Sequence, residues 1–148
     1  MPIVSQLLRS KGPEIWSVTP ETSVYDAIKL MADKGIGALL VLEGERLVGI
    51  ISERDYARKV ILQGKSSRNT PVSEIMTSRV FYVQPEQSIE ECMALMTDKH
   101  IRHLPVLQDG RLIGIISIGD VVKAIISDRE IMIRELERYI TGGHSSLD

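Results

Sequence analysis

Apolar and polar residues follow the same order in the two halves of this chain. Residues 15–18 and 80–83 are short runs rich in β-branched and aromatic side chains, and a proline follows each. Both runs predict a strand. After Ser23, and again after Ser88, apolar residues recur at helical spacing. Two further apolar runs follow in each half, at 39–42 and 47–51 and at 104–107 and 112–116.

Short motifs predict where these elements begin and end. Ser23 and Ser88 each stand three residues before an acidic residue, the spacing of a capping box that satisfies free amides at a helix start. Gly35 suits the left-handed residue that ends a helix. Its counterpart is His100, so we expect the second helix to end differently or with more strain. The Asp109-Gly110 pair is typical of a hairpin turn.

A Ser-x-x-Asp motif follows each hairpin and predicts a second helix in each half. The predicted order is therefore strand, helix, strand, strand, helix, twice. Residues 63–70 read as a polar linker, residues 121–140 as a longer helix, and residues 141–148 as a frayed tail.

The two halves are also copies in sequence. Residues 18–61 align without a gap with residues 83–126, and nearly half of the aligned pairs are identical. A repeat of this kind fixes the architecture. A lone three-stranded sheet leaves one face bare, so we expect the copies to pack together in a mixed α/β (α+β) fold. The predicted boundaries are a first repeat at 1–64, a linker at 65–71, a second repeat at 72–127, and a C-terminal helix and tail at 128–148.

Composition narrows the class of partner. The net charge of −2 argues against nucleic acid, and the longest uncharged apolar run, 36–42, is too short to span a bilayer. The N-terminus lacks the order of a signal peptide. A single cysteine excludes an intrachain disulfide and fits a reducing compartment. We therefore expect a cytoplasmic protein with no nucleic-acid or membrane partner.

The candidate chemistry lies where the last strand of each copy enters a helix. Ser52 and Asp55 in the first copy match Ser117 and Asp120 in the second. The amides of a helix start favour an anion, the serine hydroxyl can face a phosphate, and the aspartate can accept hydrogen bonds from two ribose hydroxyls. The same motif is a capping box that needs no ligand, and spacing alone favours capping over nucleotide binding.

These motifs resemble a pair of CBS domains, named for cystathionine β-synthase and called a Bateman module as a pair. The resemblance rests on the proline after each first strand, on Leu104-Pro105-Val106 and on the final Gly-x-x-Ser-x-x-Asp motif of both copies, and it covers residues 3–126. It implies a regulatory module, not an enzyme, that binds AMP, ADP, ATP or NAD in clefts between the copies. S-adenosylmethionine is the less favoured ligand. It also implies that Asp55 and Asp120 hold ribose and that Ser52 and Ser117 face phosphate.

The resemblance implies further ligand contacts. Arg102 and His103 stand where such modules carry basic phosphate-binding residues, and arginine suits phosphate because its planar fork donates two hydrogen bonds. Arg54 adds a fixed charge for a phosphate in the first copy, where the second has Gly119. The adenine side is assigned by position to Ser10, Lys11, Ile15, Gly37, Ala38, Thr77, Ser78 and Val80. Because Gly37 and Ala38 replace Arg102 and His103, we expect the two clefts to differ in affinity.

Other candidate residues favour structural roles. Asp98, His100 and His103 do not reproduce the spacing of a metal motif, so no metal is expected. Cys92 lies on an apolar helix face and is expected to be a packed thiol. Trp16 and Phe81 are expected to pack rather than to stack on a ligand. No catalytic constellation emerges.

Two functional hypotheses remain open. One is a regulatory module whose adenosine ligand changes its shape or assembly and whose downstream protein target is unknown. The other is a ligand-independent scaffold or oligomerisation protein. The C-terminal segment carries more apolar residues than one small module can bury, so we expect it to mediate a homodimer; the alternative is that it folds back over its own sheets.

Overall fold

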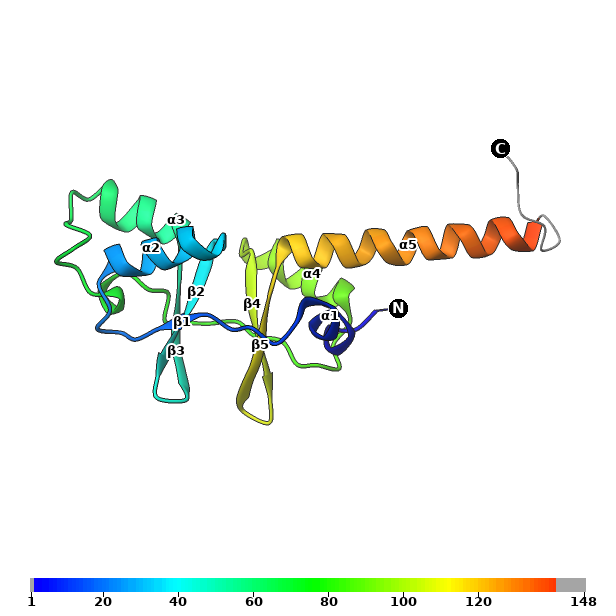
Figure 1. Ribbon diagram of the computed structural model, residues 1–148, viewed down its shortest axis with the longest axis horizontal. Coiled ribbons are helices and arrows are strands. Elements are labelled where there is room, and N and C mark those ends of the chain that lie inside the picture. Colours follow the sequence, from blue (N-terminus) through cyan, green and yellow to red (C-terminus); the bar gives the residue numbers. More distant parts are fainter. Residues whose placement is uncertain (1, 141–148) are drawn as a thin grey trace. The chain divides into compact units, whose positions relative to one another are not determined.

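The computed structural model describes residues 2–140, which form a mixed α+β fold of the predicted class (Figure 1). The helices are α1 (Val4–Lys11), α2 (Val24–Lys34), α3 (Glu53–Tyr56), α4 (Ile89–Lys99) and α5 (Ile118–Ile140). A π-helical turn (Ala57–Ile61) follows α3, and a 3₁₀ turn covers Val72–Glu74. The strands are β1 (Ser17–Val18), β2 (Ala38–Glu43), β3 (Arg46–Ser52), β4 (His103–Gln108) and β5 (Arg111–Ser117).

The described residues form two compact units whose boundaries differ from those of the repeats. Unit 1 contains residues 2–13, 83–106 and 115–140, and unit 2 contains residues 14–82 and 107–114. Helix α1, at the start of the chain, therefore packs in the same unit as α4 and α5 of the second repeat.

Unit 2 is built around a three-stranded sheet in the order β1-β2-β3. Strand β1 pairs with β2 in parallel and β2 pairs with β3 in antiparallel, with an irregularity between Val41 and Leu42. Helix α2 begins at Ser23, whose side chain accepts from the amide of Asp26, and ends at Gly35 with a φ of 65°. Its apolar face contributes to a buried core of Val24, Ala27, Met31, Leu39, Val41, Ile51, Val60, Val72 and Ile75.

Unit 1 repeats much of this order around α4. Ser88 and Glu91 form the predicted capping box, and the helix ends at His100, a non-glycine residue with a φ of 54°. Left-handed backbone costs an L-residue about 1–2 kcal/mol, so the expectation of a more strained end is confirmed. In the β4–β5 hairpin, whose turn belongs to unit 2, Asp109 and Gly110 both have positive φ, at 51° and 79°, as a two-residue turn requires.

The structure corrects the prediction of matching first strands. Only Ser17 and Val18 of the 15–18 run form a strand. The 80–83 run is not a strand, and only Val83 bridges to Val106. In the first copy Ser17 pairs with Leu40, but the matching residue of the second copy is Pro105. Proline has no amide hydrogen to donate to a strand ladder, so the pairing does not extend beyond Val83.

Helix α5 continues without a break through the boundary predicted at residue 128. The predicted frayed tail, 141–148, lies outside the described residues. Across residues 2–140, α5 included, no helix has both the length and the apolar character needed to cross a membrane.

Candidate ligand-binding site

In unit 1, Ser117 and Asp120 form a reciprocal cap at the start of α5. The Ser117 amide donates to Asp120 Oδ2 at 2.8 Å, and the Asp120 amide donates to Ser117 Oγ at 3.1 Å. The capping role expected from spacing is therefore present. Asp120 Oδ1 takes part in neither of these two hydrogen bonds.

Lys11, the last residue of α1, reaches the same carboxylate. Its ammonium group donates to Asp120 Oδ2 at 2.8 Å and to the Ile115 carbonyl at 2.7 Å. One side chain thus links the end of α1 to the end of β5 and the start of α5. The sequence assigned Lys11 to the adenine side, whereas in the structure it contacts the residue assigned to ribose. Ser10 precedes it and is exposed.

Arg102 and His103 lie beside this group. The Arg102 carbonyl accepts from the amide of Ile118, the first residue of α5, at 2.8 Å. Burial lowers the pKa of His103 below its ordinary value, and the nearby charges of Lys11 and Arg102 lower it further, while Asp120 opposes them. Unit 1 therefore gathers five of the predicted residues in one place, which we call the α5 centre: Lys11, Arg102, His103, Ser117 and Asp120.

Ionisation of Asp120 is favoured although the group is partly buried. Burial acts to raise its pKa, but the hydrogen bonds from Lys11 and from the Ser117 amide outweigh that effect, and the pKa lies below its ordinary value. The α5 centre thus holds a carboxylate and an ammonium group in contact at a helix start.

Unit 2 contains a matching group at the start of α3, which we call the α3 centre. The Ser52 amide donates to Asp55 Oδ2 at 3.0 Å, and the Asp55 amide donates to Ser52 Oγ at 3.2 Å. Here the cation is Lys59, which lies 3.2 Å from Asp55 Oδ1 and donates to the Ile75 carbonyl at 3.0 Å. Lys59 was not among the site residues predicted from the sequence. Its position four residues after Asp55 was the available signal, but its contact with Ile75 depends on the tertiary fold.

The residues that replace Arg102 and His103 also lie at the α3 centre. The Gly37 carbonyl accepts from the Glu53 amide at 3.1 Å, the same contact that Arg102 makes with Ile118. Ala38 pairs with Ser52 in the β2–β3 ladder and is buried. Neither brings a charge, so the two centres share a backbone arrangement and differ in their side chains. Arg54 lies in the first turn of α3 and is exposed.

Thr77 is held beside the α3 centre by backbone bonds. It exchanges two hydrogen bonds with Ile50, at 3.0 and 2.9 Å. This close approach depends on Gly49, because a Cβ there would lie 2.6 Å from Met76 Sδ and 3.1 Å from the Thr77 carbonyl oxygen. A glycine is therefore needed for the segment to reach β3.

Three other residues assigned to adenine lie elsewhere in unit 2. Ile15, Ser78 and Val80 line a cavity of about 930 Å³ together with residues of the two hairpin turns, among them Arg46 and Arg111. These turns are at the opposite ends of β3 and β5 from Ser52 and Ser117. The structure therefore does not bring Ile15, Ser78 and Val80 together with Ser52 and Asp55.

The described part of the chain contains neither a cluster of metal ligands nor a reactive thiol. Across residues 2–140, no three His, Cys, Asp or Glu side chains are placed to share a metal ion. Cys92 is fully buried, and burial raises its thiol pKa to about 11. A thiol with such a pKa is a poor nucleophile near neutral pH.

Comparison with known proteins also finds two copies of one domain in this chain. The family profile of the CBS domain matches residues 4–61 and 72–127. The chain belongs to the CBS-domain family. It is a CBS domain pair, a type of module known to be regulatory.

Individual relatives cover nearly the whole CBS pair. A mitochondrial CBS-domain protein of Arabidopsis thaliana, CBSX3, is 44% identical over 95% of this chain and 73% of its own length. The solved structure of a CBS-domain protein from Burkholderia ambifaria is 59% identical, covers 86% of this chain and 96% of its own, and has a TM-score of 0.83. The CBS pair of protein MJ0100, solved with 5-methylthioadenosine and S-adenosyl-L-methionine, is 25% identical over 84% of this chain and 99% of its own, with a TM-score of 0.75.

Proposed function

We propose that this CBS pair is a regulatory module that binds an adenosine-containing ligand at its α3 and α5 centres. The ligand class is AMP, ADP, ATP or NAD. Asp55 and Asp120 would accept hydrogen bonds from the ribose hydroxyls, and Ser52 and Ser117 would face the phosphate. The observation that carries the proposal is the α5 centre, where Lys11, Arg102 and His103 surround the Ser117–Asp120 cap.

The chemistry of the α5 centre suits a phosphorylated nucleoside. A helix start attracts an anion through its amides and its dipole. Lys11 and Arg102 add permanent positive charge, and Asp120 remains ionised, so it can accept hydrogen bonds from a diol. A site for adenosine alone would not need the cations, and a site for inorganic phosphate alone would not need the carboxylate.

The α3 centre offers the same ribose acceptor with fewer cations. Asp55 pairs with Lys59, but Gly37 and Ala38 supply no charge, and Glu53 stands beside Arg54. We therefore propose that the two centres differ in affinity and that the α5 centre binds phosphorylated ligands more tightly. Calorimetry is expected to show two affinities, or one occupied site, and two identical independent sites would contradict this.

The relative MJ0100 supports the nucleoside part of the proposal, because the ligands in its structure share an adenosine group. Those ligands lack a phosphate. We propose phosphorylated ligands ahead of S-adenosylmethionine for this chain because of the three basic residues at the α5 centre.

The second candidate is a ligand-independent scaffold. It is favoured by one observation: both Ser-x-x-Asp motifs form caps and both aspartates already pair with a lysine. Under this alternative the lysines are structural, and a nucleotide would neither bind nor stabilise the fold.

We propose further that the chain regulates an unidentified protein target, has no catalytic activity of its own, and forms a homodimer. Assembly varies in the family, since a CBS-CP12 protein from cyanobacteria that is 28% identical is a hexamer. The proposed compartment is the cytoplasm, on the sequence argument above. One relative is named as mitochondrial, and fractionation of cells expressing the tagged chain distinguishes the two compartments.

Thermal unfolding with added ligand tests the proposed function. A ligand that binds only the folded state stabilises it, by roughly 2.7 kcal/mol at a hundredfold excess over Kd. We expect a higher melting temperature with at least one of AMP, ADP, ATP and NAD, and a smaller shift in Asp120→Asn. Lys123→Gln, which removes a charge one turn further along α5, is the matched control. No shift with any of these ligands at millimolar concentration would favour the scaffold.

A further inference from the structure

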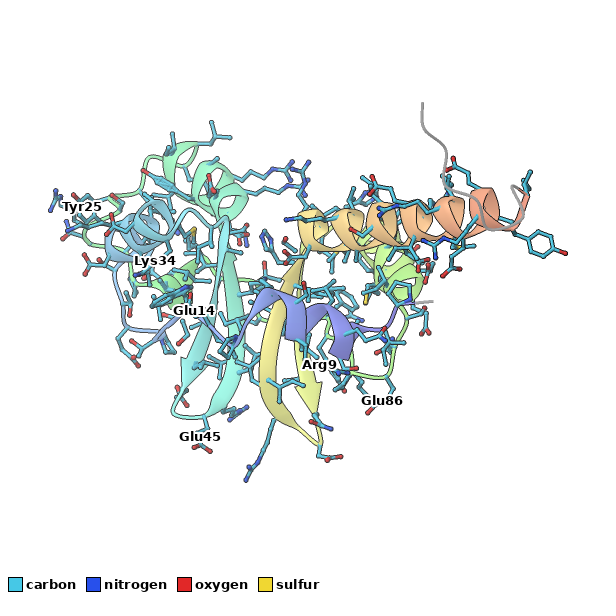
Figure 2. All side chains as sticks on the ribbon, turned by 45° about the vertical axis from the view of Figure 1, so that its right-hand side comes forward. Arg9, Glu14, Tyr25, Lys34, Glu45 and Glu86 are labelled. Atoms are coloured by element: carbon cyan, nitrogen blue, oxygen red, sulfur yellow. The ribbon has the colours of Figure 1, made fainter. Side chains whose placement is uncertain are left out.

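Helix α5 is anchored to unit 1 only through its first turns. Val121 is fully buried, and the helix contacts α1 and α4. From Arg129 to Ile140 every residue is exposed. The ribbon shows this half of the helix extending well beyond α1 and α4 (Figure 1), and side chains project from it on several sides (Figure 2).

One side of this exposed helix carries a regular apolar row. Its members are spaced alternately four and three residues apart, which is the heptad period of a coiled coil. We call this row the α5 seam: Val122, Ile126, Arg129, Ile133, Leu136 and Ile140. Its apolar members are between 40% and 79% exposed, at Val122 and Ile140 respectively. A stripe of this kind on a soluble protein marks an interface.

The charge of Arg129 decides which orientation the seam can accept. In a parallel pair of α5 helices, each seam residue faces its own copy, so the two Arg129 side chains would meet in the apolar layer. Like charges brought together away from water repel strongly. A parallel pair is therefore disfavoured by the one polar residue of the seam.

An antiparallel pair removes this conflict. When Ile126 faces Leu136 of the second copy, Arg129 faces Ile133 and Val122 faces Ile140. Four of the six layers are then apolar, and in each of the two central layers one arginine faces one isoleucine instead of a second arginine. The stem of an arginine can lie along an apolar surface while its guanidinium group reaches water. We infer that α5 pairs with α5 of a second copy of this chain as an antiparallel two-helix coiled coil.

The length and the anchoring of α5 support this pairing. The seam from Val122 to Ile140 is about 27 Å long at a rise of about 1.5 Å per residue. Most helical stability in proteins comes from the packing of an amphipathic face. Because unit 1 already holds α5 as a helix, the ordering cost of association is reduced. An antiparallel arrangement also places the folded part of unit 1 of each copy at opposite ends of the helix pair. This inference specifies the homodimer proposed above and does not depend on ligand binding.

Disulfide trapping tests the orientation on the full chain. The background is Cys92→Ala, because alanine occupies the matching position Ala27, which is also fully buried. A mixture of the Ile126→Cys and Leu136→Cys chains is expected to form a crosslinked heterodimer under mild oxidation, since a disulfide requires Cα atoms about 4.4–6.8 Å apart. Neither chain alone is expected to crosslink. A homodimer of Leu136→Cys alone would show parallel helices and would overturn the inference.

A pair of matched substitutions tests whether the seam mediates the assembly. Ile133 and Ile131 are 54% and 52% exposed, but only Ile133 belongs to the seam. In sedimentation velocity experiments Ile133→Glu is expected to raise the dimer dissociation constant at least about tenfold, whereas Ile131→Glu leaves it unchanged. An unmodified chain that is monomeric at all micromolar concentrations, equal effects of the two variants, or assembly that requires a different protein would each overturn the inference. Nucleotide-induced melting shifts in the same variants report on the proposed function separately.

Discussion

Lys11 and Asp120 form an ion pair of 2.8 Å within unit 1, although 109 positions separate them in the chain. The pair joins the C-terminus of α1 to the first turn of α5. Its carboxylate is the residue proposed to hold ribose, and its ammonium group is the nearest cation. The proposed ligand site at Asp120 and the docking of α1 against α5 therefore involve the same side chains.

Substitution of Lys11 is expected to weaken phosphate recognition specifically. Lys11→Met keeps the length of the side chain and removes its charge. A charged hydrogen bond of this kind contributes about 1.5–3 kcal/mol, so the affinity for AMP is expected to fall about tenfold or more, with little change for adenosine. Fluorescence or calorimetric titrations measure both. Arg9→Met, on the same helix, is the control; equal losses for AMP and adenosine would indicate that Lys11 only supports the fold.

Nucleotide affinity at the α5 centre is expected to depend on pH through His103. Its pKa is lowered by burial and by Lys11 and Arg102, so the folded protein favours the neutral ring. Keeping the ring neutral therefore stabilises the fold fully at pH values above 6.5, the ordinary pKa of histidine. This stabilisation is lost as the pH falls through the lowered pKa of His103. A bound phosphate favours the protonated ring instead, so binding is accompanied by proton uptake.

The measurement is the ratio of AMP affinities of the unmodified chain and His103→Gln, because the titration of the ligand itself cancels in the ratio. The ratio is expected to rise as the pH is lowered from 8 to 6. A ratio that is constant over this range would place His103 outside the ligand site.

Gly49 is expected to be intolerant of a methyl group. Gly49→Ala would bring a Cβ to within 2.6 Å of Met76 Sδ and 3.1 Å of the Thr77 carbonyl oxygen. Overpacking of this kind costs about 1–3 kcal/mol, measured as the free energy of unfolding in urea. The control is Gly119→Ala, whose Cβ would meet only Ser117 Oγ at 3.6 Å. If both variants unfold alike, the close approach of Thr77 to β3 is not as described.

Cys92 is expected to be unreactive in the folded protein. It is fully buried, and burial raises its pKa to about 11. At pH 8 a thiol reagent should therefore modify it only as fast as the chain unfolds, and immediately in denaturant. Rapid modification of the native protein would contradict the buried position.

Much of the local structure could be predicted because its determinants are adjacent in the chain. Ser23 and Ser88 cap the predicted helices, and the Asp109-Gly110 turn has the predicted conformation. The 80–83 run was the failure. Its β-branched and aromatic residues suit a strand, but the partner strand carries Pro105, which has no amide hydrogen to donate to the ladder.

The candidate site could be predicted only in part. The serines and aspartates of the Ser-x-x-Asp motifs were identified, and their caps are present. The contact of Lys11 with Asp120 and that of Lys59 with Ile75 depend on which distant elements pack together, so neither could be predicted from local patterns. The assignment of these residues to a ligand stays a prediction.

Calorimetric titration of the full chain with ATP and with 2′-deoxy-ATP tests whether Asp55 and Asp120 hold a ribose. We expect ATP to bind and the deoxy compound to bind about tenfold or more weakly, because each aspartate loses a hydroxyl donor. We also expect Asp120→Asn to remove most of this difference. Two results would contradict ribose binding: no binding of either compound, nor of AMP and NAD, or equal binding of the ribo and deoxy forms. Either result would leave the two aspartates as helix caps alone.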